Sequence, residues 1–174
     1  LAAYKKAMEQ THENVVLVDA GDAIQGEAMG TLSNGSYLVD IMNEIGYDFA
    51  TFGNHEFDYG MDVTLSLLEK SNATYLSCNF MDLKTGKTVA EPYALETYGD
   101  LKVAFVGIST PESFTKSTPT YFQDENGNYI YSFCEGNDGQ DLYDAVQASI
   151  DAAAAEGADV IIALGHCGVD EQSS

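Results

Sequence analysis

Residues 53–60, with the sequence GNHEFDYG, carry side chains that can bind a metal ion and transfer protons. An amide, Asn54, an imidazole, His55, and two carboxylates, Glu56 and Asp58, lie between two glycines. Oxygen and imidazole ligands of these types suit divalent metals such as Mn²⁺, Zn²⁺ or Fe²⁺. An imidazole beside a carboxylate can act as a general acid. The stretch therefore predicts metal-assisted or acid–base chemistry.

His55 and Asp58 have the spacing of a proton-transfer pair. An Asp three residues after a His can accept a hydrogen bond from one ring nitrogen, which fixes the tautomer and favours the imidazolium. Such a histidine can donate a proton to a leaving oxygen or stabilise developing negative charge. We therefore interpret His55 as the acid, Asn54 as a metal ligand, and Glu56 as at least partly structural.

Two further polar residues follow a glycine, as Asn54 does: Asp22 in AGD and His166 in LGH. Each glycine–polar pair comes at the end of a predicted strand, where glycine lets the backbone turn tightly. The carboxyl ends of parallel strands meet at one crevice of an open α/β sheet. Asp22, Asn54 and His166 are therefore predicted to lie close together and to bind a divalent metal.

Each of these residues has a simpler role when it is considered alone. Asp22 could be a helix N-cap or a turn residue, and Asn54 could be a turn residue with positive φ. His55 and His166 could be hydrogen-bonded histidines at strand ends. Three glycine–polar turns at three strand ends together favour a shared functional site.

The remaining sequence predicts the elements that position these side chains. Apolar runs rich in β-branched residues indicate buried strands, and apolar residues at helical spacing indicate helices. Strands are predicted within 14–22, 48–56, 74–80, 101–110 and 160–168, helices at 1–10, 35–46, 61–72 and 140–159, a hairpin excursion at 82–100 and an irregular connection at 111–139. Val15–Val18 is predicted to be buried on both faces of a sheet. The order indicates an α/β fold with a mainly parallel sheet covered by helices.

Length and charge limit the classes of partner. A chain of 174 residues is long enough for one domain with a sizeable core. Its formal net charge of −21 argues against a nucleic-acid polymer or an anionic membrane surface as partner. A small anionic substrate is compatible with this charge if a bound cation supplies positive charge. No apolar run is long enough to cross a bilayer.

Three stretches resemble the catalytic domain of the 5′-nucleotidase family within the calcineurin-like metallophosphoesterases. They are VLVDAGDAIQG, FATFGNHEFDYG and VIIALGHCGVDEQSS, and GISTPESFTKSTPTYFQDENGNYIY is similar to an insertion of the nucleotidase type. The family includes bacterial periplasmic or wall-bound nucleotidases and 2′,3′-cyclic-nucleotide phosphodiesterases. The resemblance implies a four-layer α/β/β/α domain with two divalent metals, such as Mn, Zn, Fe or Co, and a location in the periplasm, the cell wall or outside the cell.

The resemblance also implies roles for the site residues. Asp22 matches the carboxylate that bridges both metals, and Asn54 and His166 match ligands of the second metal. His55 and Asp58 match the catalytic dyad. The implied reaction is hydrolysis of nucleoside 5′-monophosphates or 2′,3′-cyclic nucleotides by a water that the two metals activate.

The chain departs from the family pattern at both ends. The first motif, Asp-x-His, is expected on a strand before Leu1, and the last motif, Gly-His-x-His, beyond Ser174. The family's C-terminal nucleoside-binding domain is also absent from the sequence. We therefore expect residues 1–174 to be part of a single metallophosphoesterase domain that carries only some of its metal ligands.

Other functions are weaker interpretations of the same residues. A thiol hydrolase would pair Cys167 with His166, but adjacent strand residues point to opposite faces. A non-catalytic module that binds a metal or a nucleotide has no need of the His55–Asp58 dyad. A dinucleotide-binding fold is not indicated, because no GxGxxG follows the first strand. The connection at 111–139 is interpreted as a cover over the sheet edge rather than as a substrate-facing loop.

Overall fold

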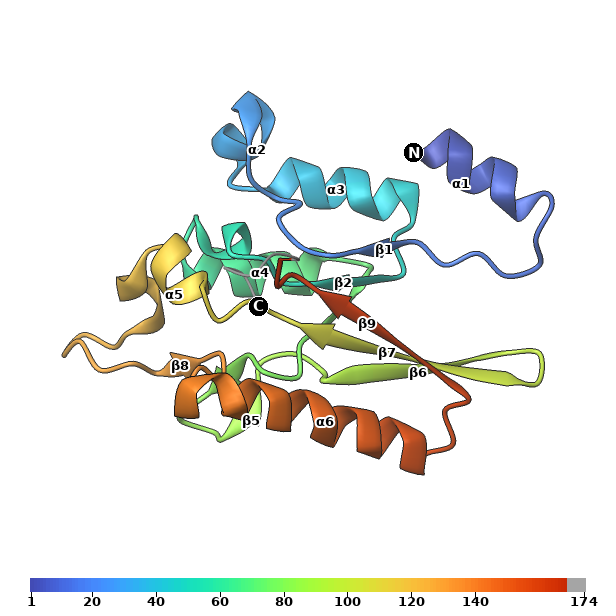
Figure 1. Cartoon of the computed structure of the whole chain (residues 1–174). Coiled ribbons are helices and arrows are strands. Elements are labelled where there is room, and N and C mark those ends of the chain that lie inside the picture. Colours follow the sequence, from blue (N-terminus) through green and yellow to red (C-terminus); the bar gives the residue numbers. More distant parts are fainter. Residues whose placement is uncertain (169–174) are drawn as a thin grey trace.

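Two β-sheets pack face to face between two layers of helices in this computed structural model, which describes residues 1–168 (Figure 1). The helices are α1 (Ala2–Glu9), α2 (Glu27–Ser33), α3 (Ser36–Ile45), α4 (Met61–Lys70), α5 (Ser113–Lys116) and α6 (Gln140–Ala155), with 3₁₀ turns η1 (His55–Phe57), η2 (Pro119–Phe122) and η3 (Asn137–Gly139). The strands are β1 (Val18–Asp19), β2 (Phe49–Thr51), β3 (Thr74–Leu76), β4 (Met81–Asp82), β5 (Lys87–Thr88), β6 (Tyr93–Tyr98), β7 (Leu101–Ile108), β8 (Tyr131–Ser132) and β9 (Val160–Gly165). The predicted α/β/β/α sandwich is confirmed.

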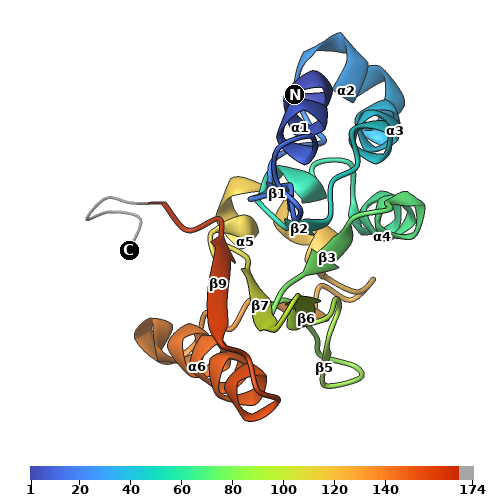
Figure 2. The same cartoon turned by 90° about the vertical axis from the view of Figure 1, so that its right-hand side faces the viewer.

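The first sheet has the order β1-β2-β3, and all its strand pairs are parallel. Parallel neighbours need a long crossover connection, and α3 and α4 provide it between consecutive strands. Helix α1 packs against α3, and α3 packs against α4, so the three helices lie on one face of this sheet (Figure 2). All three strands therefore run towards the same edge, where the polar turns after β1 and β2 lie.

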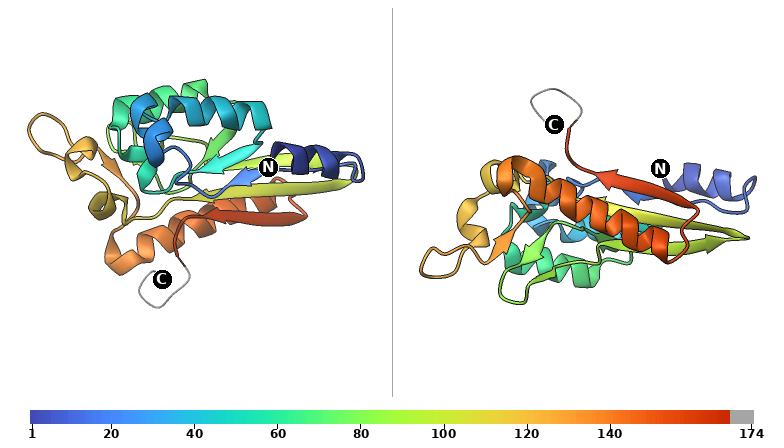
Figure 3. Two further views of the ribbon diagram at one scale, coloured as in Figure 1. Left: turned by 90° about the horizontal axis from the view of Figure 1, so that it is seen from above. Right: turned by 60° about the horizontal axis from the view of Figure 1, so that its bottom comes forward.

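The second sheet has the order β6-β7-β9. Strands β6 and β7 form an antiparallel hairpin, and β9 runs parallel to β7. Helix α6 lies against the outer face of this sheet (Figure 3). The two sheets share a core in which the rings of Phe49 and Phe105 stack with centroids 4.5 Å apart, and Leu76 and Leu164 pack beside them. This core holds the ends of β2 and β9 close together.

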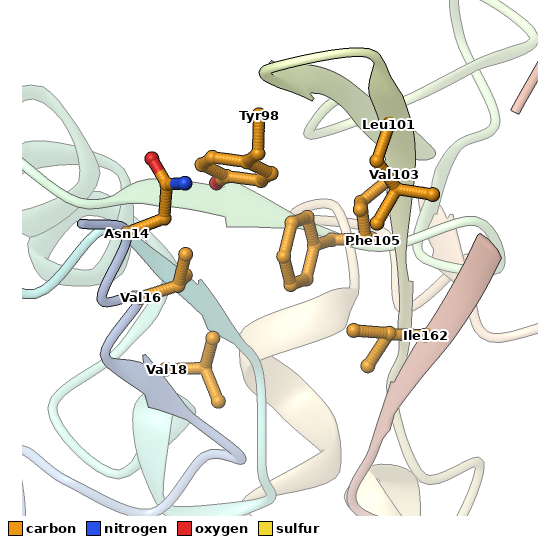
Figure 4. A pocket seen from close by; sticks show the side chains of 8 residues that line it. All are labelled: Asn14, Val16, Val18, Tyr98, Leu101, Val103, Phe105 and Ile162. Atoms are coloured by element: carbon orange, nitrogen blue, oxygen red, sulfur yellow. The ribbon is translucent and has the colours of Figure 1, made fainter. Parts of the chain in front are cut away.

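A groove remains open between β1 and the second sheet (Figure 4). Within the described residues, β1 pairs only with β2, so its other edge is free. The groove has a volume of about 480 Å³. Its lining is almost entirely apolar and consists of Asn14, Val16, Val18, Tyr98, Leu101, Val103, Phe105 and Ile162.

An aromatic cluster anchors the long connection between β7 and α6. The fully buried rings of Phe57, Phe122 and Phe133 meet edge to face, with Phe122 5.1 Å and Phe133 5.4 Å from Phe57 between centroids. Phe114 of α5 contacts Phe122 and Phe133 in the same way. A small antiparallel sheet, β5-β4-β8, ties the end of this connection to the hairpin at β4 and β5. As a result α5 packs against η1.

Several local predictions were wrong. Val15–Val18 is half-buried rather than buried on both faces, because β1 lies at a sheet edge beside the open groove. The sheet was predicted to be mainly parallel, but only the first sheet is wholly parallel, since β6 adds an antiparallel edge to β7 and the β5-β4-β8 sheet is antiparallel. Helix α2 was not predicted.

Among the helices of residues 1–168, none is long and apolar enough to cross a membrane.

Candidate metal and catalytic site

Three strand ends meet at one corner of the sandwich and bring together residues that are distant in sequence. Asp22 follows β1, His55 follows β2 and His166 follows β9. Asp22 Oδ2 lies 3.2 Å from His166 Nε2, and Asp22 Oδ1 accepts a 2.8 Å hydrogen bond from the backbone N–H of His55. Asp22 therefore joins the turns after β1, β2 and β9.

The turn that presents Asp22 depends on close backbone approach. Asp22 has a φ of 67°, in the left-handed region. A Cβ on Gly53 would overlap Asp22 Oδ1, and a Cβ on Gly21 would overlap the backbone of Gly53. Glycine at these two positions is what allows the turns after β1 and β2 to touch.

Glu56 holds the two turns together from beneath. Its carboxylate accepts hydrogen bonds from the N–H groups of Gly53 at 2.6 Å, Asp22 at 2.8 Å and Ala23 at 2.9 Å. The side chain is buried, and burial raises the pKa of Glu56 to about 7, although the N–H groups of Asp22 and Gly53 act in the opposite direction. The structural role predicted for Glu56 thus has a definite form, which is to orient Asp22.

His166 has the orientation of a metal-binding histidine. Its Nδ1–H donates a 2.9 Å hydrogen bond to the carbonyl oxygen of Ala20. This bond orients the ring so that Nε2 faces the carboxylate of Asp22. A ligand histidine in metalloproteins is commonly held by such a bond from its other ring nitrogen.

His55 and Asp58 form the pair expected from their spacing. His55 Nδ1 and Asp58 Oδ2 are 2.6 Å apart, and the imidazole remains 40% exposed. The hydrogen bond to Asp58 raises the pKa of His55, and the nearby carboxylates of Asp22 and Glu56 raise it further against the effect of burial. A protonated ring with one face open can donate a proton to a bound substrate.

A cavity of about 340 Å³ lies in front of these groups. Its lining combines the predicted residues with side chains from the connection after β7: Asn54, His55, Thr110, Glu112, Lys116, His166, Cys167 and Gly168. The connection was interpreted only as a cover, but it also contributes to the cavity wall. The rule that directed attention to strand ends could have found Thr110, which follows β7 by two residues.

The donor set and the local charge fit a divalent cation. Asp22 offers a carboxylate, His166 an imidazole nitrogen, and Asn54 an amide that makes no side-chain hydrogen bond within residues 1–168. Burial raises the pKa of the neighbouring Asp19, and the charge of Asp22 raises it too. A cation would relieve this crowding of carboxylates. In the described part of the chain, however, no three His, Cys, Asp or Glu side chains gather closely enough to bind a metal by themselves, so the chain offers part of a ligand set.

Cys167 also reaches the cavity, contrary to the expectation that it would point away from His166. Strand β9 ends at Gly165, so the alternation of side chains no longer applies at these two residues. Burial raises the pKa of Cys167, which keeps the thiol protonated and a poor nucleophile. The thiol-hydrolase interpretation gains no support from this geometry.

Comparison with known proteins gives one consistent family. The family model described as "Calcineurin-like phosphoesterase" matches residues 1–174. The chain is 31% identical over 174 residues to the snake venom 5′-nucleotidase of Gloydius brevicauda, covering 95% of this chain and 27% of the relative. It is also 31% identical to the 5′-nucleotidase of Bos taurus, covering 98% of this chain and 28% of the relative. The chain thus spans little more than a quarter of the length of these relatives.

A solved structure supports the same grouping. The NAD nucleotidase of Haemophilus influenzae superposes with a TM-score of 0.80 at 28% identity, covering 98% of this chain and 32% of that chain. The calcineurin-like phosphoesterase YfkN of Bacillus subtilis superposes with a TM-score of 0.77 at 26% identity, covering 99% of this chain and 54% of that chain.

Proposed function

The chain belongs to the calcineurin-like phosphoesterase family, and from this premise we propose that the protein hydrolyses nucleoside 5′-monophosphates or 2′,3′-cyclic nucleotides. The family is enzymatic, and relatives of this chain are named 5′-nucleotidases. The observation that carries the proposal is the corner where Asp22, His55 and His166 meet within hydrogen-bonding distance.

Asp22, Asn54 and His166 are the residues of this chain that would hold divalent metal, with Mn, Zn, Fe and Co as candidates and two ions as the expected number. Metal bound there would supply an activated water and positive charge for the phosphoryl oxygens. Glu56 keeps the Asp22 carboxylate aimed into the corner, and the Ala20 carbonyl keeps Nε2 of His166 free to bind.

His55 is the proposed acid. Its ring lines the cavity, and its Nδ1–H is engaged by Asp58, so Nε2–H is the group that can face the substrate. From there it can stabilise a phosphoryl oxygen or give its proton to the leaving ribose oxygen. Asp58 orients the ring and favours its protonated form before this step.

The relatives also suggest a setting for the domain. We propose that residues 1–174 are part of a single catalytic domain whose first metal motif lies before Leu1 and whose last lies after Ser174, with a separate domain gripping the nucleoside. This agrees with the small share of the relatives that the chain covers. A location outside the cytoplasm is proposed, and the venom origin of one relative supports it.

The test is phosphate release from AMP and ring opening of 2′,3′-cyclic AMP to adenosine monophosphate, measured with Mn²⁺ and with EDTA. It compares this chain with a longer form extended at both ends to the length of the relatives, and with the His55→Ala variant of that form. Turnover that needs Mn²⁺ and His55 supports the proposal. A longer form that is inert with every metal and ester, yet binds AMP, would instead identify a non-catalytic binding module.

A further inference from the structure

Positive charge is scarce in this protein. The chain has a formal net charge of −21, and its seven basic residues are all lysines. Only Lys116 is among the residues that line the cavity beside His55. An anionic substrate approaching this corner therefore meets one lysine ammonium group from the described chain, together with the protonated His55.

The position of Lys116 follows from packing that the catalytic residues share. Lys116 ends helix α5, which packs against η1, the turn that contains His55. Phe114 anchors α5 in the same aromatic cluster as Phe57 of η1, and Ser113 is completely buried. The backbone N–H of Lys116 donates a 2.7 Å hydrogen bond to the carbonyl of Glu112. The backbone that carries Lys116 is thereby fixed relative to His55, while its side chain extends into solvent at the cavity wall.

The charges around Lys116 leave it available for a ligand. Glu112 lines the same cavity, but within residues 1–168 no carboxylate oxygen lies within 4 Å of Lys116 Nζ, whereas Lys5 and Lys70 are paired with Asp48 and Asp40. Asp22 and Glu56 lie at the bottom of the corner and engage backbone N–H groups. Lys116 therefore lines the cavity as a cation without an ion-pair partner in the described part of the chain.

We propose that Lys116 contacts the phosphoryl group of the substrate and makes the site selective for dianionic phosphate monoesters over monoanionic cyclic diesters. The inference rests on the proposed function and adds a substrate preference to it. A phosphate monoester carries close to two negative charges at neutral pH, and a cyclic diester carries one. A lysine acts on phosphate as a flexible point charge, so its contribution grows with the charge of the group it meets.

The experiment compares Lys116→Met with Lys84→Met in the longer form of the protein. Lys84 lies at the exposed tip of the β4–β5 hairpin and serves as the matched control. In Lys116→Met, kcat/KM for AMP should fall about tenfold, mainly through KM, since a charge-assisted hydrogen bond is lost. For 2′,3′-cyclic AMP, kcat/KM should fall by no more than about threefold, because the cyclic diester carries only one negative charge for the lysine to attract. Lys116→Arg should restore part of the AMP rate, and Lys84→Met should leave both substrates unchanged.

A second measurement separates this inference from the proposed function. Inorganic phosphate should inhibit the wild type more strongly than Lys116→Met, with an inhibition constant about tenfold lower. Equal losses for AMP and cyclic AMP, or unchanged kinetics in Lys116→Met, would overturn the role of Lys116 while hydrolysis itself stands. If the wild type hydrolyses neither AMP nor 2′,3′-cyclic AMP, the proposed function fails. In that case the binding of inorganic phosphate, monitored by ³¹P NMR, tests the role of Lys116. Equal phosphate affinity of the wild type and Lys116→Met would overturn the inference.

Discussion

The His55–Asp58 pair sets the charge state of the proposed acid. Its hydrogen bond of 2.6 Å favours the imidazolium over the neutral ring, which is why the pKa of His55 is raised. Because the folded-state pKa lies above the unfolded value, the pair stabilises the fold below the unfolded pKa of about 6.5, and this contribution is lost as the pH rises through the folded value. The ring is partly exposed, so the effect on stability is small and the effect on protonation is the useful one.

Asp58→Asn should lower the pKa of His55 towards or below its ordinary value of 6.5. The amide removes the negative charge that favours the imidazolium but can keep a contact to the ring. The pKa is measured from the ring proton shifts in an NMR titration of this chain. Asp62→Asn on the exposed side of α4 is the control and should leave the titration unchanged. Identical titration curves in the wild type and Asp58→Asn would show that Asp58 does not set the charge of His55.

Glu56 is the buried carboxyl whose protonation should affect stability most. Burial raises its pKa from 4.5 to about 7. A raised folded pKa means that stabilisation is complete below about pH 4.5 and declines as the pH rises to about 7, where the buried group ionises. Each pKa unit corresponds to about 1.4 kcal/mol, so the decline amounts to a few kcal/mol.

Glu56→Gln should remove this pH dependence, because Gln does not titrate. The stability of the wild type relative to Glu56→Gln is therefore expected to decrease between pH 5 and pH 8. Urea unfolding at both pH values measures the difference, with Glu44→Gln on the exposed side of α3 as the control that should follow the wild type. Parallel pH profiles for the wild type and Glu56→Gln would contradict the account.

At this scale the sequence predicted local contacts better than distant ones. The His55–Asp58 contact lies within one turn, so spacing alone could indicate it. The bond from Asp22 N–H to Glu56 spans 34 residues, and no local pattern specifies it. The three glycine–polar turns revealed the corner because sheet topology, rather than sequence spacing, brings them together.

At the scale of elements, the connection after β7 owes its place to aromatic packing. Phe122 is fully buried and touches both Phe57 of η1 and Phe114 of α5. The same cluster therefore supports the turn with the proposed acid and the helix with Lys116. A substitution there should affect stability and the site together.

Phe122→Ala should destabilise the chain by about 3–5 kcal/mol, since it removes a buried ring and leaves a cavity. Tyr143→Ala on α6 is the control, because Tyr143 is 65% exposed and its loss should change stability by no more than about 0.5 kcal/mol. Urea denaturation gives both values. A loss below about 1 kcal/mol for Phe122→Ala would mean that the connection is not anchored as the structure indicates.

The elements with strong patterns were predicted well, and those made by tertiary pairing were not. The apolar run LKVAFVGI forms β7, and the Ala-rich stretch forms α6, as expected. The two-residue strands β4, β5 and β8 exist only through their pairing with one another, so their sequences carry little signal. The edge position of β1 likewise depends on neighbours that periodicity does not identify.

At the scale of the molecule, the free edge of β1 has a defined geometry. Helices α1, α3 and α4 lie on one face of the first sheet, and the sheet advances from β1 to β3 through α3 and α4 (Figure 2). Crossovers between parallel strands have one hand. A strand preceding α1 would therefore add to the free edge of β1, beside the apolar groove of Figure 4.

Ile162→Thr tests this geometry in two backgrounds. Ile162 lines the groove and is 39% exposed in this chain, so the substitution should cost less than about 1 kcal/mol here. In the longer form a strand would cover the groove, and the cost should rise to about 2–3 kcal/mol, because a hydroxyl would then be buried. Denaturant unfolding of both pairs gives the comparison. An equal cost in the two backgrounds would show that nothing covers this groove.

The most direct test of the site is Mn²⁺ binding to this chain. Paramagnetic broadening of backbone NMR signals shows which residues lie near the bound ion. Asp22→Asn is the matched variant, because Asn accepts the left-handed backbone of this turn. Mn²⁺ should first broaden the signals of residues 53–55 and 165–167 in the wild type, and this selectivity should disappear in Asp22→Asn. Signals of the exposed acidic turn at residues 124–128 should respond equally in both proteins. Broadening that spares the corner, or that is the same in Asp22→Asn, would contradict a metal site built on Asp22, Asn54 and His166.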